Sequence, residues 1–199
     1  MTTVRMKNFP RKIIRRCAGI VQKFRIAYYA ALSSDARIQG RLKKSRPLLI
    51  AGEGTIVING IATVGYFPSP FYFNSYAHFD LRNPNAHIEI GDGVIFNNNS
   101  TLIADGATIS IGADALIGLN VTVMTSDAHG LEPEKRRSLD FPRENVSIGD
   151  NVFIGNDVTI LKGVSIGNNS VIGNGSIVVD NIPGNVIAAG LPCRVIKAF

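Results

Sequence analysis

Residues 146–178 read VSIGDNVFIGNDVTILKGVSIGNNSVIGNGSIV, and a branched aliphatic residue returns at every sixth position of this stretch. These positions are Ile148, Ile154, Ile160, Ile166, Ile172 and Val178. A Val or a Ser stands four residues after each of the first five, and glycine, asparagine or aspartate fills most of the positions between them. A six-residue period fits neither a helix, with about 3.6 residues per turn, nor the alternation of a plain strand. It indicates a solenoid in which short strands alternate with turns.

The same repeat predicts the turns and the core of this solenoid. Glycine, asparagine and aspartate tolerate positive φ, so they suit the turns. If three units close one triangular coil, every leading aliphatic residue points inward and stacks on the residue three units along. We therefore predict an all-β solenoid with continuous aliphatic columns inside, in which each coil depends on its neighbours for stability.

The repeats resemble those of the hexapeptide-repeat acyltransferases, whose unit is an aliphatic residue, a glycine, two variable residues, a small residue or valine, and one more. The resemblance covers residues 85–199 well and the first 80 residues poorly. Its repeats begin at Ile90, continue to Val123 with three extra residues around Asp105, and resume at residue 146. The resemblance implies a left-handed parallel β-helix domain over residues 47–199, preceded by a basic α-helical segment over residues 1–46.

Length and composition suit one cytoplasmic domain. The 199 residues are enough for a sizeable core, and the 20 glycines and the absence of Trp favour strands and turns over a helical bundle. Cys17 and Cys193 lie far apart and carry no metal-site spacing, so we expect a reduced protein in the cytoplasm. No run of 18 or more apolar residues occurs, and we therefore predict no membrane span.

Positive charge is concentrated in the amino-terminal segment. Residues 1–46 hold 13 Lys or Arg against Asp35 alone, a net charge of +12, whereas the rest of the chain has a net charge of −6. From Pro10 onward a helix is predicted, because the following apolar residues have helical spacing: Ile13, Cys17, Ile20, Val21, Phe24, Tyr28 and Ala31. Such a helix either lies on anionic lipid at the inner face of the membrane or, as we expect, packs on the solenoid's end or on a partner subunit. No nucleic-acid reading motif accompanies the basic residues, so no nucleic acid partner is expected.

A long loop, at about residues 126–145, interrupts the repeats after Val123. An excursion of this length in a compact repeat domain is usually functional. Its beginning, Thr125-Ser126-Asp127-Ala128-His129-Gly130, resembles the catalytic segment of the family, in which a histidine removes the proton from an acceptor hydroxyl or amine. The resemblance makes His129 the general base, and imidazole suits that role because it titrates near neutral pH. Asp127 either orients the imidazole ring or shapes the turn.

Two residues are candidates for contact with the acceptor. Asn97 and Asp105 match positions at which the galactoside, maltose and related sugar acetyltransferases contact their acceptors. An amide and a carboxylate are suitable partners for sugar hydroxyls. Asn and Asp also fill turns throughout this chain, so acceptor contact and turn formation both remain open for these two residues.

The carboxyl-terminal stretch carries the candidate contacts with the phosphates of the acyl donor. Residues 181–197 resemble the closing segment of the family, where two basic residues meet the 3′-phosphate and pyrophosphate of CoA. Arg194 and Lys197 occupy these positions, and phosphates favour such cations. One departure lies just before this segment, where many sugar acetyltransferases carry Thr-Lys and this chain has Val179-Asp180. One CoA phosphate contact is therefore missing or replaced.

Backbone groups are expected to line the rest of the donor site. In the family, consecutive repeats line the pantetheine arm, and the corresponding residues are Gly118, Asn156 and Asn174. The amide of Asn156 also corresponds to a group that supports the oxyanion formed at the thioester carbon. Family members pack three chains side by side, so the resemblance implies a homotrimer in which His129 faces the CoA groove of a neighbouring chain.

The resemblance implies an acetyl-CoA-dependent O-acetyltransferase that acts on a sugar hydroxyl, in the biosynthesis of a bacterial surface polysaccharide. The same base serves N-acetylation of an amino sugar, which is the first alternative. A second is a non-enzymatic solenoid scaffold at the membrane surface. The γ-class carbonic anhydrases share this solenoid but bind a metal through three histidines. Here His78, His87 and His129 lack the close spacing of those ligands, so no metal is expected.

Overall fold

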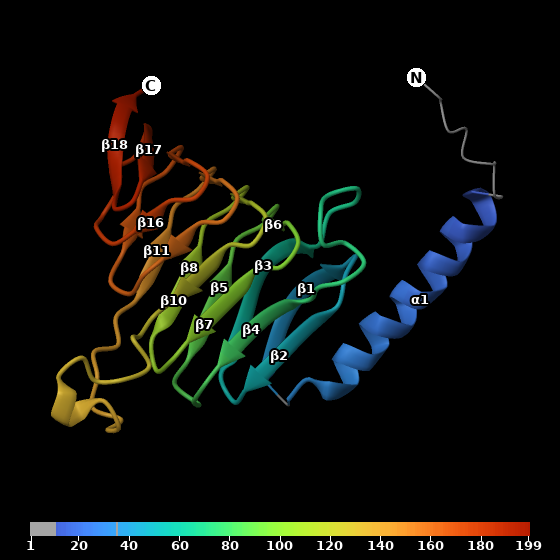
Figure 1. Cartoon of the computed structure of the whole chain (residues 1–199), viewed down its shortest axis with the longest axis horizontal. Helices are drawn as coiled ribbons and strands as arrows, with labels where there is room; N and C mark the ends of the chain where they lie inside the picture. Colours follow the sequence, from blue (N-terminus) through green and yellow to red (C-terminus); the bar gives the residue numbers. More distant parts are fainter. Residues whose placement is uncertain (1–10, 35) are drawn as a thin grey trace, which may run out of the picture.

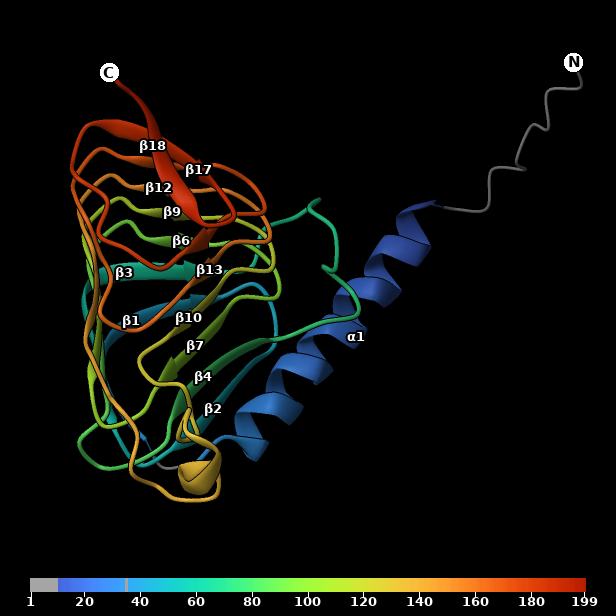
Figure 2. The ribbon, with the colours of Figure 1, turned by 60° about the vertical axis from the view of Figure 1, so that its left-hand side comes forward.

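The computed structural model describes residues 11–34 and 36–199, and Pro10, the predicted start of the helix, lies outside them. Helix α1 (Arg11–Leu32) precedes a stack of short strands that coil around one axis (Figure 1). Viewed more nearly along that axis, the coils enclose a compact interior while α1 lies outside them (Figure 2). The strand pairs between successive coils are parallel.

The strands form three faces of a triangular prism. The first face holds the first half of β3 (Thr55–Val64) with β5 (His87–Ile90), β8 (Thr108–Ile111), β11 (Val146–Ile148) and β14 (Ser165–Ile166). The second face holds the second half of β3 with β6 (Ile95–Phe96), β9 (Leu116–Ile117), β12 (Phe153–Ile154), β15 (Val171–Ile172) and β17 (Val186–Gly190). The third face holds β2 (Leu48–Gly52), β4 (Ala77–Leu81), β7 (Thr101–Ala104), β10 (Thr122–Met124), β13 (Thr159–Ile160) and β16 (Ile177–Val178). Strand β18 (Cys193–Ala198) pairs antiparallel with β17 and closes the stack, and the 3-10 helix η1 (Pro133–Lys135) lies in the long loop.

The predicted aliphatic columns are present, one behind each face. Ile111, Ile148 and Ile166 are partners in successive coils of the first face, and all three are buried. Equivalent buried columns stand behind the other two faces: Phe96, Ile117, Ile154 and Ile172 on the second, and Leu102, Val123, Ile160 and Val178 on the third. The six-residue period therefore reports the stacking directly, and the prediction of the core is confirmed.

The corners between the faces explain the many asparagines and aspartates. Asn99, Asn120 and Asp157 occupy the same corner in successive coils, each with positive φ of 56° to 64°. The Nδ2 of Asn99 donates to Oδ1 of Asn120 at 2.9 Å, and the Nδ2 of Asn120 donates to Oδ1 of Asp157 at 2.8 Å. These residues tolerate the left-handed conformation and bond from one coil to the next, so they turn the chain and hold neighbouring coils together.

The solenoid begins before residue 47, the first residue of the β-helix domain predicted from the sequence. Strand β1 (Arg37–Lys44) lies inside the range 1–46 that was assigned to the basic helical segment. It pairs in parallel with β3 over both of its halves, from Arg37 opposite Thr55 to Lys44 opposite Val64. This strand was not predicted from the sequence, because basic and apolar residues alternate along it. Its outer side is charged, and of its residues only Leu42 packs against the core.

Helix α1 turns its polar side toward the solenoid. The Nε2 of Gln22 donates to the carbonyl of Tyr72 at 3.1 Å, and Arg25 donates to the carbonyls of Phe73 and Ser75 at 2.6 and 2.9 Å. The apolar residues at helical spacing lie on the opposite side and are exposed. The expectation that this apolar side packs on the solenoid of the same chain is wrong, because polar bonds fix the rotation of the helix. Among residues 11–34 and 36–199, no helix is long and apolar enough to cross a membrane.

Candidate active site

The loop that carries His129 leaves the prism at the corner between the third and first faces. It joins β10 to β11 and projects from the stack as the yellow segment with η1 in Figures 1 and 2. Thr125 and Ser126 are buried at its start, Ala128 has a φ of 64°, and His129 is exposed. The imidazole is therefore exposed to solvent on a segment that begins in the core and is anchored there. A general base that meets an external acceptor needs such a position.

Asp105 ties the two ends of this loop together. Its carboxylate is almost fully buried, and it accepts bonds from Oγ of Ser126 at 3.0 Å and from Nε of Arg143 at 3.4 Å. Asn83 Nδ2 donates to the same carboxylate at 3.0 Å, while the backbone N–H of Asp105 donates to Oγ1 of Thr125 at 2.8 Å. The three extra residues in the repeat thus place a carboxylate beneath the loop. Both of its oxygens are occupied within the chain, which favours a positioning role over acceptor contact.

Replacement of Asp105 by alanine is expected to lower kcat by about tenfold to 100-fold, because the loop that presents His129 loses its anchor. The KM for acetyl-CoA and the KM for the acceptor should each stay within about twofold. Asp92→Ala is the control, since the Asp92 carboxylate also accepts a hydrogen bond, in its case from the backbone N–H of Ile61, but lies in another coil. Steady-state kinetics decide the matter: a raised acceptor KM with unchanged kcat would instead make Asp105 an acceptor contact.

Asp127 is held by a lysine of the next coil. The Nζ of Lys162 lies 2.8 Å from Oδ2 of Asp127, and both side chains are about four-fifths buried. Within the described ranges, no hydrogen bond or ion pair joins Asp127 to His129. The structure therefore shows how Asp127 shapes the base of the loop, and its orienting role toward the imidazole stays a prediction.

The predicted donor residues form a column at the corner between the second and third faces. The N–H of Asn97 donates to the carbonyl of Ile117, and the N–H of Gly118, one coil further, donates to the carbonyl of Ile154, each at 2.8 Å. Oδ1 of Asn156 accepts from the N–H of Leu119 at 2.9 Å. The structure thus brings the predicted donor residues Gly118, Asn156 and Asn174 to the same corner as Asn97, a predicted acceptor contact, although the four residues are spread over 78 residues of sequence.

Asn156 is more constrained than the sequence indicated. Its backbone N–H donates to Oδ1 of Asn174 at 2.8 Å, so this group already has a partner. Its side-chain Nδ2 has no partner among the residues described here. An oxyanion contact from Asn156 therefore requires either the side-chain amide or a displaced Asn174. Asn97 is similarly occupied on one side, because its Oδ1 accepts from the N–H of Asn98 at 2.7 Å.

The two candidate groups lie at different corners of the prism. The donor column precedes the strands of the third face, whereas Asp105 and the His129 loop follow those strands. The width of the third face therefore separates His129 from Asn156 within one chain. A single chain does not bring the candidate general base and the candidate donor column together.

The closing hairpin places two cations at the end of the stack. Strand β17 pairs with β15, which carries the donor column, and β18 holds Arg194 and Lys197 with exposed side chains. Nη1 of Arg194 forms an ion pair with Oδ2 of Asp180 at 2.7 Å. Asp180 is one of the two residues, with Val179, that depart from the family pattern, so the departure places an anion against one of the two expected phosphate ligands. Arranged this way, the cations and the column fit an elongated donor with its phosphates at the closing hairpin.

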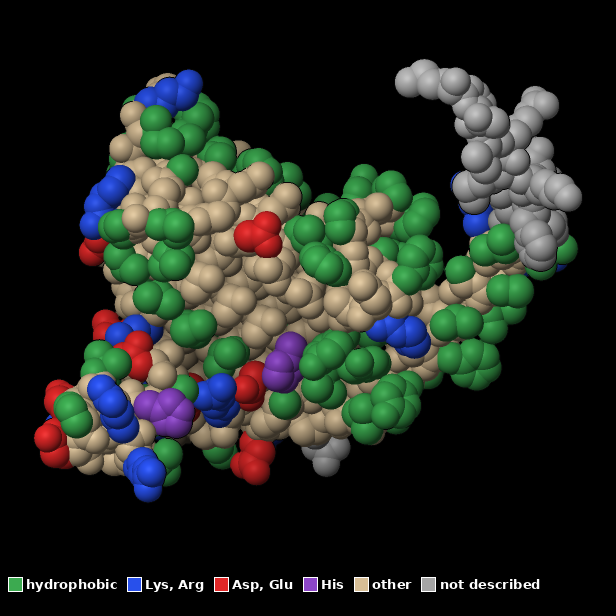
Figure 3. Space-filling view, viewed as in Figure 1, with side chains coloured by type: hydrophobic (Ala, Val, Ile, Leu, Met, Phe, Trp, Pro, Cys, Tyr) green, Lys and Arg blue, Asp and Glu red, His purple; other side chains and the backbone are tan. Residues whose placement is uncertain are grey.

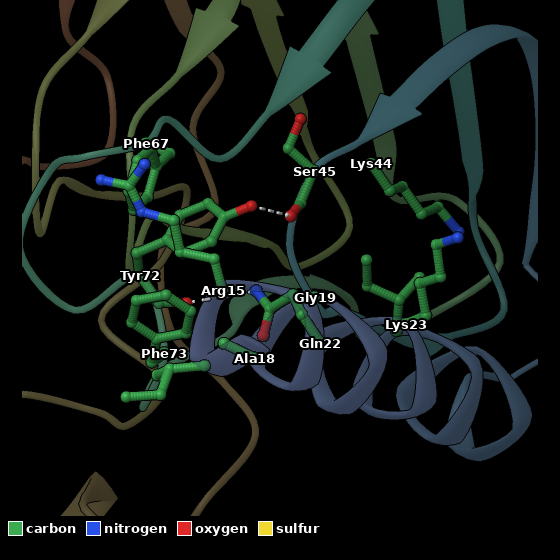
Figure 4. A pocket seen from close by; sticks show the side chains of 12 residues that line it. Arg15, Ala18, Gly19, Gln22, Lys23, Lys44, Ser45, Phe67, Tyr72 and Phe73 are labelled. Atoms are coloured by element: carbon green, nitrogen blue, oxygen red, sulfur yellow. Dashed lines mark hydrogen bonds between the residues drawn. The ribbon is translucent and has the colours of Figure 1, made fainter. Parts of the chain in front are cut away.

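The structure also shows a buried cysteine and a cleft away from the candidate site. Cys193 is buried, and burial raises the pKa of its thiol, which works against a thiolate nucleophile. In the part of the chain that the structure describes, no cluster of three or more His, Cys, Asp or Glu side chains has the geometry to hold a metal ion. A cleft of about 950 Å³ lies between α1 and the loop around Tyr72, with Arg15, Lys23 and Lys44 on its walls (Figure 4). This cleft lies neither at the corner of the donor column nor at the corner of the His129 loop.

Comparison with known proteins places this arrangement in a class. Residues 145–180 match the family model described as bacterial transferase hexapeptide (six repeats). The galactoside O-acetyltransferase of Escherichia coli strain K12 is 40% identical over 171 residues, which cover 82% of this chain and 79% of that protein. The solved structure of a galactoside acetyltransferase in complex with coenzyme A is 26% identical, with a TM-score of 0.54, and covers 92% of this chain and 81% of that one. The hexapeptide-repeat acetyltransferase VCA0836 from Vibrio cholerae, solved with acetyl-CoA, has the same fold at 23% identity and a TM-score of 0.56, over 96% of this chain and 90% of that one.

The coiled strands, the interrupting loop and the closing hairpin define an acyltransferase built on a left-handed parallel β-helix. The chain belongs to the hexapeptide-repeat acetyltransferases of the galactoside O-acetyltransferase type, and acetyl-CoA is its acyl donor. The predictions of the family, of the fold class, of transferase activity and of the donor are confirmed. The roles of the individual site residues stay predictions.

Proposed function

We propose that this protein transfers the acetyl group of acetyl-CoA to a hydroxyl of a sugar or glycan, with His129 as general base. The observation that carries this proposal is the exposed His129 on a loop whose two ends are clamped by the buried carboxylate of Asp105. The names of the galactoside O-acetyltransferases to which this chain is similar support a sugar hydroxyl as the acceptor. N-acetylation of an amino sugar is the alternative, because the same base serves an amine.

The proposed reaction is a direct transfer. His129 removes the proton of the acceptor hydroxyl as its oxygen attacks the thioester carbonyl carbon. The resulting oxyanion is stabilised by a hydrogen-bond donor of the column, for which Asn156 Nδ2 is the candidate. The carbon–sulfur bond then breaks, the acetyl ester is released, and the CoA thiolate takes the proton that His129 carries.

A homotrimer completes the proposed site, because the base and the donor column lie at different corners of one chain. The outer side of the second face supports such packing with an apolar stripe across successive coils, formed by Ile95, Leu116, Phe153 and Val171. Ile95, Leu116 and Phe153 are 37–47% exposed. We propose that this stripe lies against a neighbouring chain, so that His129 of one chain faces the donor column of the next.

We place the enzyme in the cytoplasm, in the building of a bacterial surface polysaccharide. Acetyl-CoA is made and used inside cells, and cysteines that remain unpaired fit a reducing compartment. A scaffold without activity is disfavoured, because the chain belongs to a family of acetyltransferases and because a scaffold would leave the exposed His129 and the paired ends of its loop without a role.

The first experiment measures thiol release from acetyl-CoA with free sugars, nucleotide sugars, amino sugars and lipid-linked oligosaccharides as acceptors. Release with one acceptor, lost in His129→Ala, supports the proposal, and mass spectrometry of the product separates an ester from an amide. Binding of CoA without release on any acceptor, in a protein whose oligomeric state is trimeric, would point to a different acceptor class. Absence of CoA binding, tested by protection against thermal unfolding, would leave only the scaffold.

Asp180→Asn is expected to lower the KM for acetyl-CoA by about threefold to tenfold, because it frees Arg194 from its ion pair for a phosphate. The pair is well exposed, so the effect is modest. Arg194→Ala should raise the same KM. For each variant, the KM is measured for acetyl-CoA and for an acetyl donor that lacks the 3′-phosphate, and the two changes relative to the parent protein are compared. Equal changes for both donors would remove Arg194 from contact with that phosphate.

A further inference from the structure

The outward side of α1 is an apolar surface with no cover from its own chain. We define the outward arc as Ile13, Cys17, Ile20, Val21, Phe24 and Tyr28. Its five large apolar residues are each more than half exposed, and Phe24 reaches 72%. Hydrophobic side chains follow the helix along its length in Figure 3. A continuous apolar stripe of this length on a helix marks a contact surface.

The arc cannot be buried by rotation of the helix about its own axis. Gln22 and Arg25 bond to the loop beneath, and Oγ of Ser33, just past the helix, accepts from the N–H of Ile50 at 3.0 Å. Turning the arc inward would break these bonds and take the Gln22 and Arg25 donors away from the loop carbonyls, which is costly. The structure therefore fixes the arc outward.

Cations border the arc, and no acidic residue lies in the helix. At 100° per residue, Arg16 and Lys23 fall along one edge of the arc, and both are exposed. An apolar face with a cationic border and no acid is the pattern of helices that lie in the plane of an anionic bilayer. Over the whole sequence, residues 1–46 are strongly positive while the rest is negative, so an anionic surface attracts the helix and repels the solenoid.

We propose that the outward arc of α1 docks flat on an anionic lipid bilayer, with Ile20 and Phe24 among the acyl chains and Arg16 and Lys23 at the headgroups. A second copy of the helix fits the arc less well, because antiparallel pairing would bring the same cations together without an acidic partner. Docking holds the solenoid beside the membrane surface. The proposal stands independently of acetyl transfer, since it uses none of the candidate catalytic residues.

The experiment is sedimentation of the full-length protein with vesicles. Vesicles of phosphatidylcholine with phosphatidylglycerol are compared with vesicles of phosphatidylcholine alone, at low and high salt. We expect binding to the anionic vesicles, weakened by salt, and a loss of at least about tenfold in the partition coefficient for Ile20→Asp/Phe24→Asp. The matched control is Ile196→Asp/Phe199→Asp, which makes the same two substitutions at exposed positions, 64% and 72%, in the closing hairpin. It should bind as the parent does.

Two results would overturn the proposal. One is failure of the parent protein to bind the anionic vesicles. The other is equal loss of binding in both double variants, which would trace the effect to general negative charge. Analytical ultracentrifugation of the same proteins tests the alternative that a second copy of the chain covers the arc. If Ile20→Asp/Phe24→Asp lowers the oligomeric state and the parent protein does not bind vesicles, the arc is a contact between copies. Circular dichroism confirms that each variant is folded.

Discussion

Substitution of His129 by alanine is expected to lower kcat by about 100-fold or more while the affinity for CoA stays within about twofold. The imidazole is exposed on a loop at the corner between the third and first faces, away from the donor column of its own chain. Its removal therefore takes away the group that accepts the proton and leaves the donor contacts in place. Steady-state assays of thiol release give kcat, and isothermal titration calorimetry with CoA gives the affinity.

The control for this experiment is His87→Ala, because His87 is also an exposed histidine but lies on β5 in a different coil. It should retain full kcat. If His129→Ala keeps its turnover, then His129 has no part in the chemistry and another base must be sought. If it loses CoA affinity together with kcat, the loop contacts the donor and its role is binding.

Arg46→Ala is expected to lower the free energy of unfolding by about 3 kcal/mol. The guanidinium is buried at 1% exposure, and it donates to the carbonyls of Phe71 and Ser75 and, at 3.0 Å, to Oγ of Ser75. It also lies 5.2 Å from the centre of the Tyr72 ring. Alanine would remove these bonds and leave a cavity beside the ring, so the loop that receives α1 would loosen, although the Ser75 carbonyl keeps its bond from Arg25.

Urea denaturation measures this loss, and Arg41→Ala is the control, since Arg41 is exposed on β1. Burial, and next the charge of Arg25, lower the pKa of Arg46 to about 10, so its guanidinium is charged at neutral pH. Because the folded-state pKa lies below the unfolded value, the charge itself costs stability, and this cost falls as pH rises through 10 and above. A loss as small in Arg46→Ala as in Arg41→Ala would show that the carbonyls find other donors.

Several candidate site residues stand out in the sequence because they lie at repeat positions or within a motif. His129 follows a run of regular repeats and lies in a long loop. Gly118 stands one residue after the leading isoleucine of its repeat, and Asn156 and Asn174 stand two residues after theirs. Neither the repeat position nor the motif shows which groups of a neighbouring coil a side chain bonds to. Asp105 reads equally as a turn residue or an acceptor contact in the sequence, whereas its bonds to Ser126 and Arg143, 21 and 38 residues away, make it an anchor of the loop.

The direction of α1 shows the same division. Helical spacing of Ile13, Ile20 and Phe24 predicts the helix correctly, yet it does not say which side meets the solenoid. That choice was made by Gln22 and Arg25, whose side chains find free carbonyls in the loop around Tyr72. Periodicity measures which residues share a face, and only the bonds formed in three dimensions decide what that face touches.

The sequence by itself determined the coil, the three buried columns and the place of the long loop that carries His129, because each repeat carries the same local signal and neighbouring repeats reinforce it. The tertiary structure alone decided the clamp at Asp105, the pairing of Arg194 with Asp180 and the outward arc of α1. These contacts join segments that follow different patterns. Their partners are set by which corners and loops the stacking brings within hydrogen-bond distance, and that is a property of the whole assembled coil.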